Sequence, residues 1–62
     1  MCLSTVYRGS QSDDNICCKF VAKIEVDGDK LKFTDVLGEE MTVEGRLLSA
    51  DLTAGVVVIA AA

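Results

Sequence analysis

Apolar and polar residues alternate along most of the chain with a period of two, the pattern of β-strands that have one buried and one solvated face. The alternation is clearest within residues 16–27, where Ala22, Ile24 and Val26 share one face and charged residues share the other. We expect the apolar face to point inward. The other segments with strand character are residues 2–8, 30–34, 41–52 and 56–60.

Short polar stretches that contain glycine separate these segments and predict turns. Asp27-Gly28-Asp29 is a strong hairpin signal, because glycine readily adopts a positive φ angle. Gly45 instead lies inside a predicted strand, where glycine usually marks a bulge or a sharp bend at a barrel corner. Five short strands at this spacing predict an all-β fold, a small antiparallel five-stranded barrel or rolled sheet of the SH3 or Sm-like type.

Two features favour self-association. The 62 residues suffice for a single domain, residues 1–62, and a domain this small buries only about 60% of its unfolded surface. The predicted last strand, Val56-Val57-Val58-Ile59-Ala60, is apolar on both faces. Since one face of an antiparallel strand is normally solvated, something must cover the second. We favour a subunit interface, with burial inside a closed barrel as the alternative.

Charge and residue content restrict the function. Ten acidic and six basic residues give a net charge of −4, whereas a nucleic-acid binder needs a basic face to displace counterions from phosphates. Histidine is absent and no nucleophile–base pair can be proposed, so we do not expect an enzyme. For the three aromatic residues, Tyr7, Phe20 and Phe33, we expect core packing and not base stacking.

No segment has the features of a targeting signal or a membrane span. The start of the chain lacks a basic region followed by a long apolar run. The longest apolar stretch, residues 56–62, is far shorter than the roughly 20 residues of a spanning helix. Three cysteines, an odd number, fit a reducing compartment better than a disulfide framework, so we expect a cytoplasmic protein.

Cys2 is the strongest candidate for metal chemistry. Removal of Met1 would leave a chain that begins with a thiol and an α-amine on one residue, and these two groups can close a five-membered chelate. Two such ends would supply two sulfur and two nitrogen donors, a set that suits Ni(II) or Cu(II) better than Mg or Ca. The alternative, which the residues alone favour, is a small buried side chain at the start of a strand.

Cys17 and Cys18 are adjacent in a predicted strand, where neighbouring side chains point to opposite faces. We therefore expect two structural cysteines whose thiols do not share an ion, with an auxiliary metal or redox role as the alternative. The acidic pairs Asp13-Asp14 and Glu39-Glu40 lie in a loop and a turn, where we expect them to be solvated.

Several segments together resemble the CooT family of small nickel-binding proteins. They are Met1-Cys2-Leu3-Ser4-Thr5-Val6-Tyr7, Val26-Asp27-Gly28-Asp29, Asp35-Val36-Leu37-Gly38-Glu39-Glu40, and Val43-Glu44-Gly45-Arg46 leading to Asp51. The resemblance implies a homodimer of small β-barrels that holds one Ni(II) between its subunits through Cys2, with backbone nitrogens of Met1 or Cys2 as further donors. It also implies a link to the maturation of a nickel-containing carbon monoxide dehydrogenase.

The function expected from this resemblance is that of a Ni(II) chaperone or store, which serves a nickel enzyme or its maturation machinery. Cys2 is the one site residue that the resemblance transfers to this chain, and it assigns no role to Cys17 and Cys18. Some family members carry the label predicted RNA-binding protein, so an RNA-binding small barrel is a second hypothesis. An interaction module with a vestigial metal site is a third.

Overall fold

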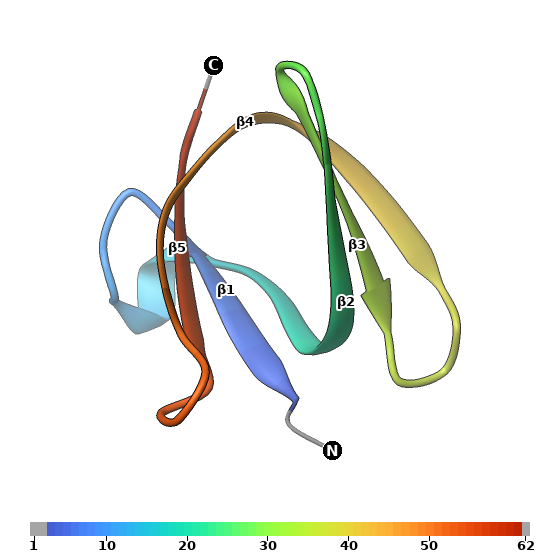
Figure 1. Cartoon of the computed structure of the whole chain (residues 1–62). Coiled ribbons are helices and arrows are strands. Elements are labelled where there is room, and N and C mark those ends of the chain that lie inside the picture. Colours follow the sequence, from blue (N-terminus) through green and yellow to red (C-terminus); the bar gives the residue numbers. More distant parts are fainter. Residues whose placement is uncertain (1–2, 62) are drawn as a thin grey trace.

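A computed structural model describes residues 3–61. Its elements are β1 (Ser4–Arg8), the 3-10 turn η1 (Asp13–Asn15), β2 (Ile16–Asp27), β3 (Lys30–Asp35), β4 (Glu40–Asp51) and β5 (Val56–Ala61). Each strand pairs with the next, and β1 also pairs with β5, which closes the sheet into a barrel (Figure 1). The predicted all-β, five-stranded barrel is therefore confirmed. Within residues 3–61, no helix is long and apolar enough to cross a membrane.

The barrel closes through a parallel pairing. Successive strands of the meander are antiparallel, whereas β1 runs parallel to β5, with Thr5 opposite Val56 and Arg8 opposite Ile59. A meander with an odd number of strands leaves its first and last strands running in the same direction, so its closing pair must be parallel. The single parallel pair is therefore a consequence of closing the predicted antiparallel five-stranded barrel.

The core is a small set of enclosed side chains from β1, β2, β3 and β5. They are Val6, Val21, Leu31, Phe33, Val57 and Ile59. Burial of a side chain of this kind stabilises the fold by about 1.5–3 kcal/mol relative to exposure. Leu31 and Phe33 share a face as the alternation predicts, and Cys17 and Cys18 pack against the core from half-buried positions.

The inward face of β2 differs in part from the one that the alternation predicts. Ile24 is half-buried, but Ala22 and Val26 are exposed, and Val21 is the β2 residue that enters the core. A register shift between Val21 and Lys23 makes Ala22 the extra residue of a β-bulge, which changes the phase of the alternation there. Val26 lies next to the hairpin end of the strand, where less of the barrel covers it.

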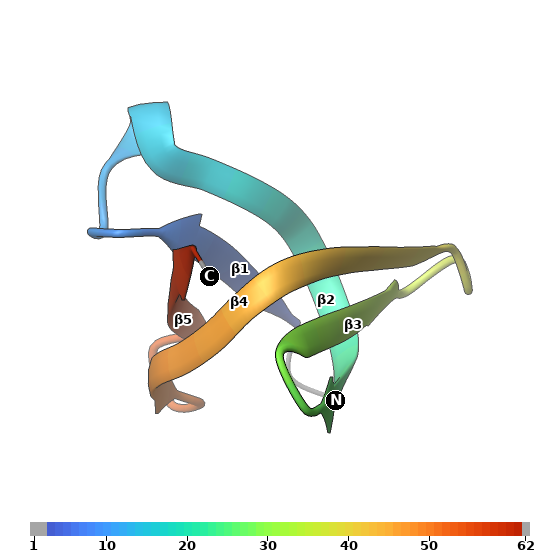
Figure 2. The same ribbon diagram turned by 90° about the horizontal axis from the view of Figure 1, so that it is seen from above.

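The two longest strands, β2 and β4, each change partner halfway and form the corners of the barrel (Figure 2). The first half of β2 pairs with β1 and the second half with β3. The first half of β4 pairs with β3 and the second half with β5. Each long strand therefore serves two neighbours, which lets five strands enclose a core.

Gly45 marks the corner of β4, as the sequence predicts. It is the first β4 residue that pairs with β5, opposite Ala61, and its amide donates a hydrogen bond to the carbonyl oxygen of Asp29 at 2.8 Å. A Cβ at this position would collide with the carbonyl oxygen of Ala60. Glycine is therefore required here by the close approach of two backbones.

Phe20 marks the corner of β2, and the prediction that it packs in the core is wrong. Its φ angle is 57°, a left-handed backbone conformation that residues other than Gly, Asn and Asp rarely adopt. Its side chain is 60% exposed. The carbonyl oxygen of Phe20 accepts a hydrogen bond from the amide of Val36 at 3.0 Å, which ties the corner to the β3–β4 turn. Phe33 is buried as predicted and Tyr7 is half-buried.

The last strand, β5, is paired along both of its edges. Val57 and Ile59 enter the core, while Val56, Val58 and Ala60 on the other face are half-buried. Barrel closure therefore accounts for part of the two-sided apolar pattern. A subunit interface over the second face stays a prediction.

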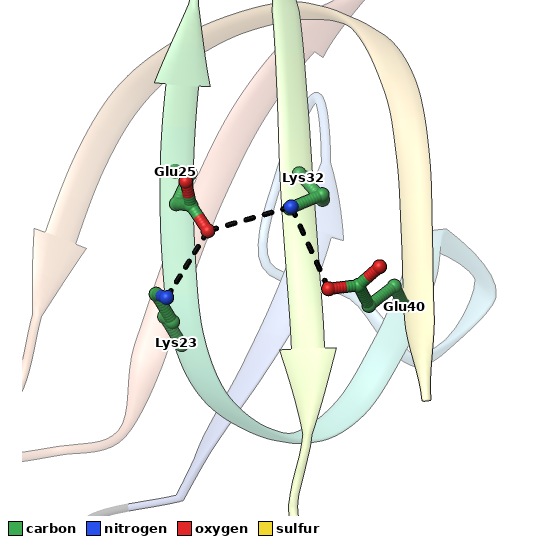
Figure 3. A network of polar contacts seen from close by, with 4 residues as sticks. All are labelled: Lys23, Glu25, Lys32 and Glu40. Carbon is green, nitrogen blue, oxygen red and sulfur yellow. Dashed lines mark ion pairs between the residues drawn. The ribbon is translucent and has the colours of Figure 1, made fainter. Parts of the chain in front are cut away.

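Charged side chains form a network on the solvated face of β2, β3 and β4 (Figure 3). A carboxylate oxygen of Glu25 lies 3.2 Å from the Nζ of Lys23 and 3.5 Å from the Nζ of Lys32, which is also 3.5 Å from Glu40. Lys23, together with Lys32, lowers the pKa of Glu25, and the two glutamates raise the pKa of Lys32. Glu25 thus pairs with a lysine of its own strand and with one of the neighbouring strand, whereas Lys30 forms no ion pair with any described residue.

Candidate metal centre

Cys2, the nickel ligand expected from the sequence, lies outside the described residues, so its role stays a prediction. The described chain begins beside a cleft of about 300 Å³, which we call the N-terminal cleft. Its lining residues are Ser4, Val21, Ala22, Lys23, Ile24 and Leu52. Leu52 is 64% exposed there, so the surface next to the start of β1 is largely apolar.

The β4–β5 turn fixes this leucine next to β1. The carboxylate of Asp51 accepts hydrogen bonds from the amides of Thr53 at 3.1 Å and of the following residue at 3.0 Å. Gly55 adopts a positive φ angle of 71° at the end of the turn, and its carbonyl oxygen accepts a hydrogen bond from the amide of Thr5 at 2.8 Å. The Asp and Gly of this turn supply the usual chemistry of a tight connection.

A group of three sulfur atoms lies between β2 and β4. The Sγ of Cys18 is 3.3 Å from the Sδ of Met41 and 3.7 Å from the Sγ of Cys17. We call these three residues the sulfur cluster. The guanidinium of Arg8, at the end of β1, lies 3.8 Å from the Sγ of Cys17. The prediction that the two cysteine thiols point to opposite faces is therefore wrong.

A β-bulge explains why the two thiols meet. Tyr7 pairs with Ile16 and Val6 pairs with Cys18, so one step along β1 corresponds to two steps along β2. Cys17 is the extra residue, and a bulge interrupts the strict alternation of side chains between the two faces. Sequence reasoning also missed Met41 and Arg8, because both reach the cluster from other strands and carry no local motif.

Partial burial makes the Cys18 thiol weakly acidic. The pKa of Cys18 is raised to about 12, chiefly by desolvation and then by the hydrogen bond and charge of Cys17, while the charge of Arg8 partly opposes the rise. The Cys18 thiol is therefore protonated at neutral pH.

The sulfur cluster borders solvent on two sides. A cleft of about 420 Å³ is lined by Cys17, Met41 and Arg8 among others. A second cleft of about 180 Å³ is lined by Cys18 and Met41 and by the carboxylates Asp35, Glu39 and Glu40. Within residues 3–61, no three Cys, Asp or Glu side chains come together in a way that could hold a metal ion, and the third sulfur atom of the cluster belongs to the thioether of Met41.

Fold and site together define a small, acidic β-barrel protein whose chemically distinctive atoms are sulfurs. The family description "CO dehydrogenase accessory protein CooT" matches residues 1–60, and the chain belongs to this CooT family. The resemblance seen in the sequence is thereby confirmed, and membership implies a role accessory to CO dehydrogenase. No curated protein and no solved structure matches the chain.

Proposed function

We propose that this protein binds Ni(II) through Cys2 at the interface of a homodimer and acts as a nickel chaperone or store for CO dehydrogenase. The observation that carries the proposal is the family match, which extends over residues 1–60 and so includes Cys2. The nickel is cargo for another protein in this proposal, and no step of catalysis is assigned to the chain.

The donor set of Cys2 supports a site shared by two chains. One Cys2 offers a thiolate sulfur and an adjacent nitrogen, which is half of the four-coordinate nitrogen and sulfur set that suits Ni(II). A two-fold axis repeats the same patch on both subunits, so two Cys2 residues would complete the set. Dimer formation and metal binding are then coupled, because the ion bridges the two copies.

The N-terminal cleft is the surface that we expect the second copy to cover. It lies beside Ser4, two positions after Cys2 in the sequence, and presents the exposed side chains of Leu52 and Ala22. A contact at this cleft would bring the two N-terminal segments together and would remove apolar surface from water.

The decisive experiment is a nickel titration of the full chain, followed by calorimetry and native mass spectrometry. We expect one Ni(II) per two chains, and we expect Cys2→Ser to abolish binding while the barrel remains folded. Nickel affinity that is unchanged in Cys2→Ser would contradict the proposal.

A matched pair of variants tests where the copies meet. Leu52 and Val26 are both exposed, at 64% and 63%, and the β2–β3 hairpin beside Val26 lies at the end of the barrel opposite the start of β1 (Figure 1). Leu52→Glu should convert the dimer to monomers and weaken nickel binding, whereas Val26→Glu should leave both unchanged. Equal behaviour of the two variants in light scattering would refute an interface at the N-terminal cleft.

A further inference from the structure

The nickel proposal leaves the sulfur cluster without a function. Its three sulfur atoms come from two different strands, and Cys18 lies within 3.7 Å of Cys17 and 3.3 Å of Met41. The geometry therefore raises the question of which ligand three converging sulfurs would take.

The spacing of the sulfurs is close to that of ligands on one metal ion. With metal–sulfur bonds of about 2.3 Å, two sulfur ligands of one ion lie about 3.8–4.0 Å apart. The 3.7 Å between Cys17 and Cys18 already fits this spacing. Met41 must withdraw slightly from Cys18, and its side chain is flexible and 47% exposed, so it is free to do so.

The chemical character of the donors selects a soft ion. Thiolate and thioether ligands favour Cu(I), whereas a neutral thioether adds little for the harder divalent ions. Two thiolates and one monovalent cation leave a single negative charge. The Arg8 guanidinium, 3.8 Å from the Sγ of Cys17, balances that charge.

The surroundings also favour entry of a cation. The smaller of the two clefts beside the cluster carries the carboxylates Asp35, Glu39 and Glu40 on its wall, and it leads to Cys18 and Met41. Carboxylates lining a narrow entrance raise the local concentration of cations.

We propose that Cys17, Cys18 and Met41 form a three-coordinate, all-sulfur site for a soft monovalent metal ion of the Cu(I) class. Binding replaces the two thiol protons, which pass to solvent, and the ion enters already as Cu(I), so no electron is transferred. The site uses neither Cys2 nor a second copy of the chain, and it is therefore independent of the nickel proposal.

The test is an anaerobic Cu(I) titration of Cys2→Ser protein against bicinchoninate, a chromophoric Cu(I) chelator. We expect one Cu(I) per chain in native mass spectra. Adding Cys17→Ser or Cys18→Ser should weaken binding by at least about 100-fold, and adding Met41→Leu by about 10-fold, since even the loss of outer-shell partners costs 10–100-fold.

X-ray absorption of the Cu(I)-loaded protein supplies a readout that does not depend on the cysteine variants folding. We expect three sulfur neighbours around copper in the Cys2→Ser protein and two in the variant that also carries Met41→Leu. Copper with no thioether ligand, or affinity that is unchanged in Cys17→Ser and Cys18→Ser, would overturn the proposal. Nickel stoichiometry of otherwise unmodified Cys17→Ser protein separates the two sites, because it should stay at one ion per two chains.

Discussion

The corners of β2 and β4 solve the same geometric problem in different ways. Both strands bend halfway and exchange one partner for another. The β4 corner uses Gly45, whose missing side chain admits the backbone of Ala60. The β2 corner has no glycine and instead combines Phe20 at a φ angle of 57° with bulges at Cys17 and Ala22. One corner is a tight backbone contact, and the other is an irregular, strained segment.

This difference has a chemical consequence. The irregular β2 corner brings the thiols of Cys17 and Cys18 to the same side of the strand, within reach of Met41. A regular strand would have separated the thiols. The β4 corner places no comparable group, since close packing there leaves room only for hydrogen. Local irregularity is the kind of feature that gathers at functional sites, where the surrounding structure holds it in place.

The largest expected effect on the stability of the fold comes from adding a side chain at the β4 corner. Gly45→Ala places a methyl group against the carbonyl oxygen of Ala60 and should lower the free energy of unfolding by about 3 kcal/mol, as overpacking of a close contact does. Chemical denaturation measures this change. Gly38→Ala is the control, because Gly38 has a φ of 87° and open space around it, so only backbone strain of about 1 kcal/mol should appear. Equal losses in the two variants would contradict a steric role for Gly45.

A smaller effect is expected from relaxing the β2 corner. Phe20→Gly should be more stable than Phe20→Ala by about 1 kcal/mol, because only glycine adopts a positive φ angle without a steric penalty. The comparison with alanine cancels the loss of the aromatic side chain. Thermal and urea denaturation measure the difference. At an ordinary strand position the alanine variant would be more stable than the glycine variant. Greater stability of Phe20→Ala would therefore show that the corner is not strained.

The smallest expected effect is on the pH dependence of stability, and it concerns the β2 corner because only that corner carries a thiol. The pKa of Cys18 is about 12 in the folded protein, above the usual thiol value near 9.0, so the folded state keeps a proton that the unfolded state loses. Stability should therefore be fully present below pH 9 and decline as pH rises toward 12. Denaturation midpoints measured across this range test the decline. The decline should be smaller in Cys18→Ala, where only the contribution of Lys32 remains, and should persist in full in Gly45→Ala, whose corner contains no thiol.

The sequence was sufficient for the fold because the fold depends on features that are local. Alternation placed Leu31 and Phe33 in the core, and the Asp-Gly-Asp turn and Gly45 marked a hairpin and a corner. The bulges of β2 depend instead on how β1 and β3 pair with it, which no local pattern records. For that reason the exposure of Phe20 and of Ala22 was not predicted.

The two candidate sites differ in the same way, because one depends on local sequence and the other on how the strands pair. Cys2 stands out because of its position in the chain and its family pattern, so sequence alone proposes it. The sulfur cluster requires a bulge at Cys17 and a methionine 23 residues from Cys18, and both become visible only when the strands are assembled. Adjacent cysteines in a strand predict separation, and a tertiary effect reverses that prediction.

The parallel closing pair also determines where the two ends of the described chain emerge. Because β1 and β5 run in the same direction side by side, the start of β1 and the end of β5 lie at opposite ends of the barrel (Figure 1). A label or fusion partner attached at the carboxyl end, beyond β5, would therefore project away from the start of β1. Experiments on metal loading can accordingly use a carboxy-terminal handle, whereas an amino-terminal one would occupy the very nitrogen that the proposed chelate needs.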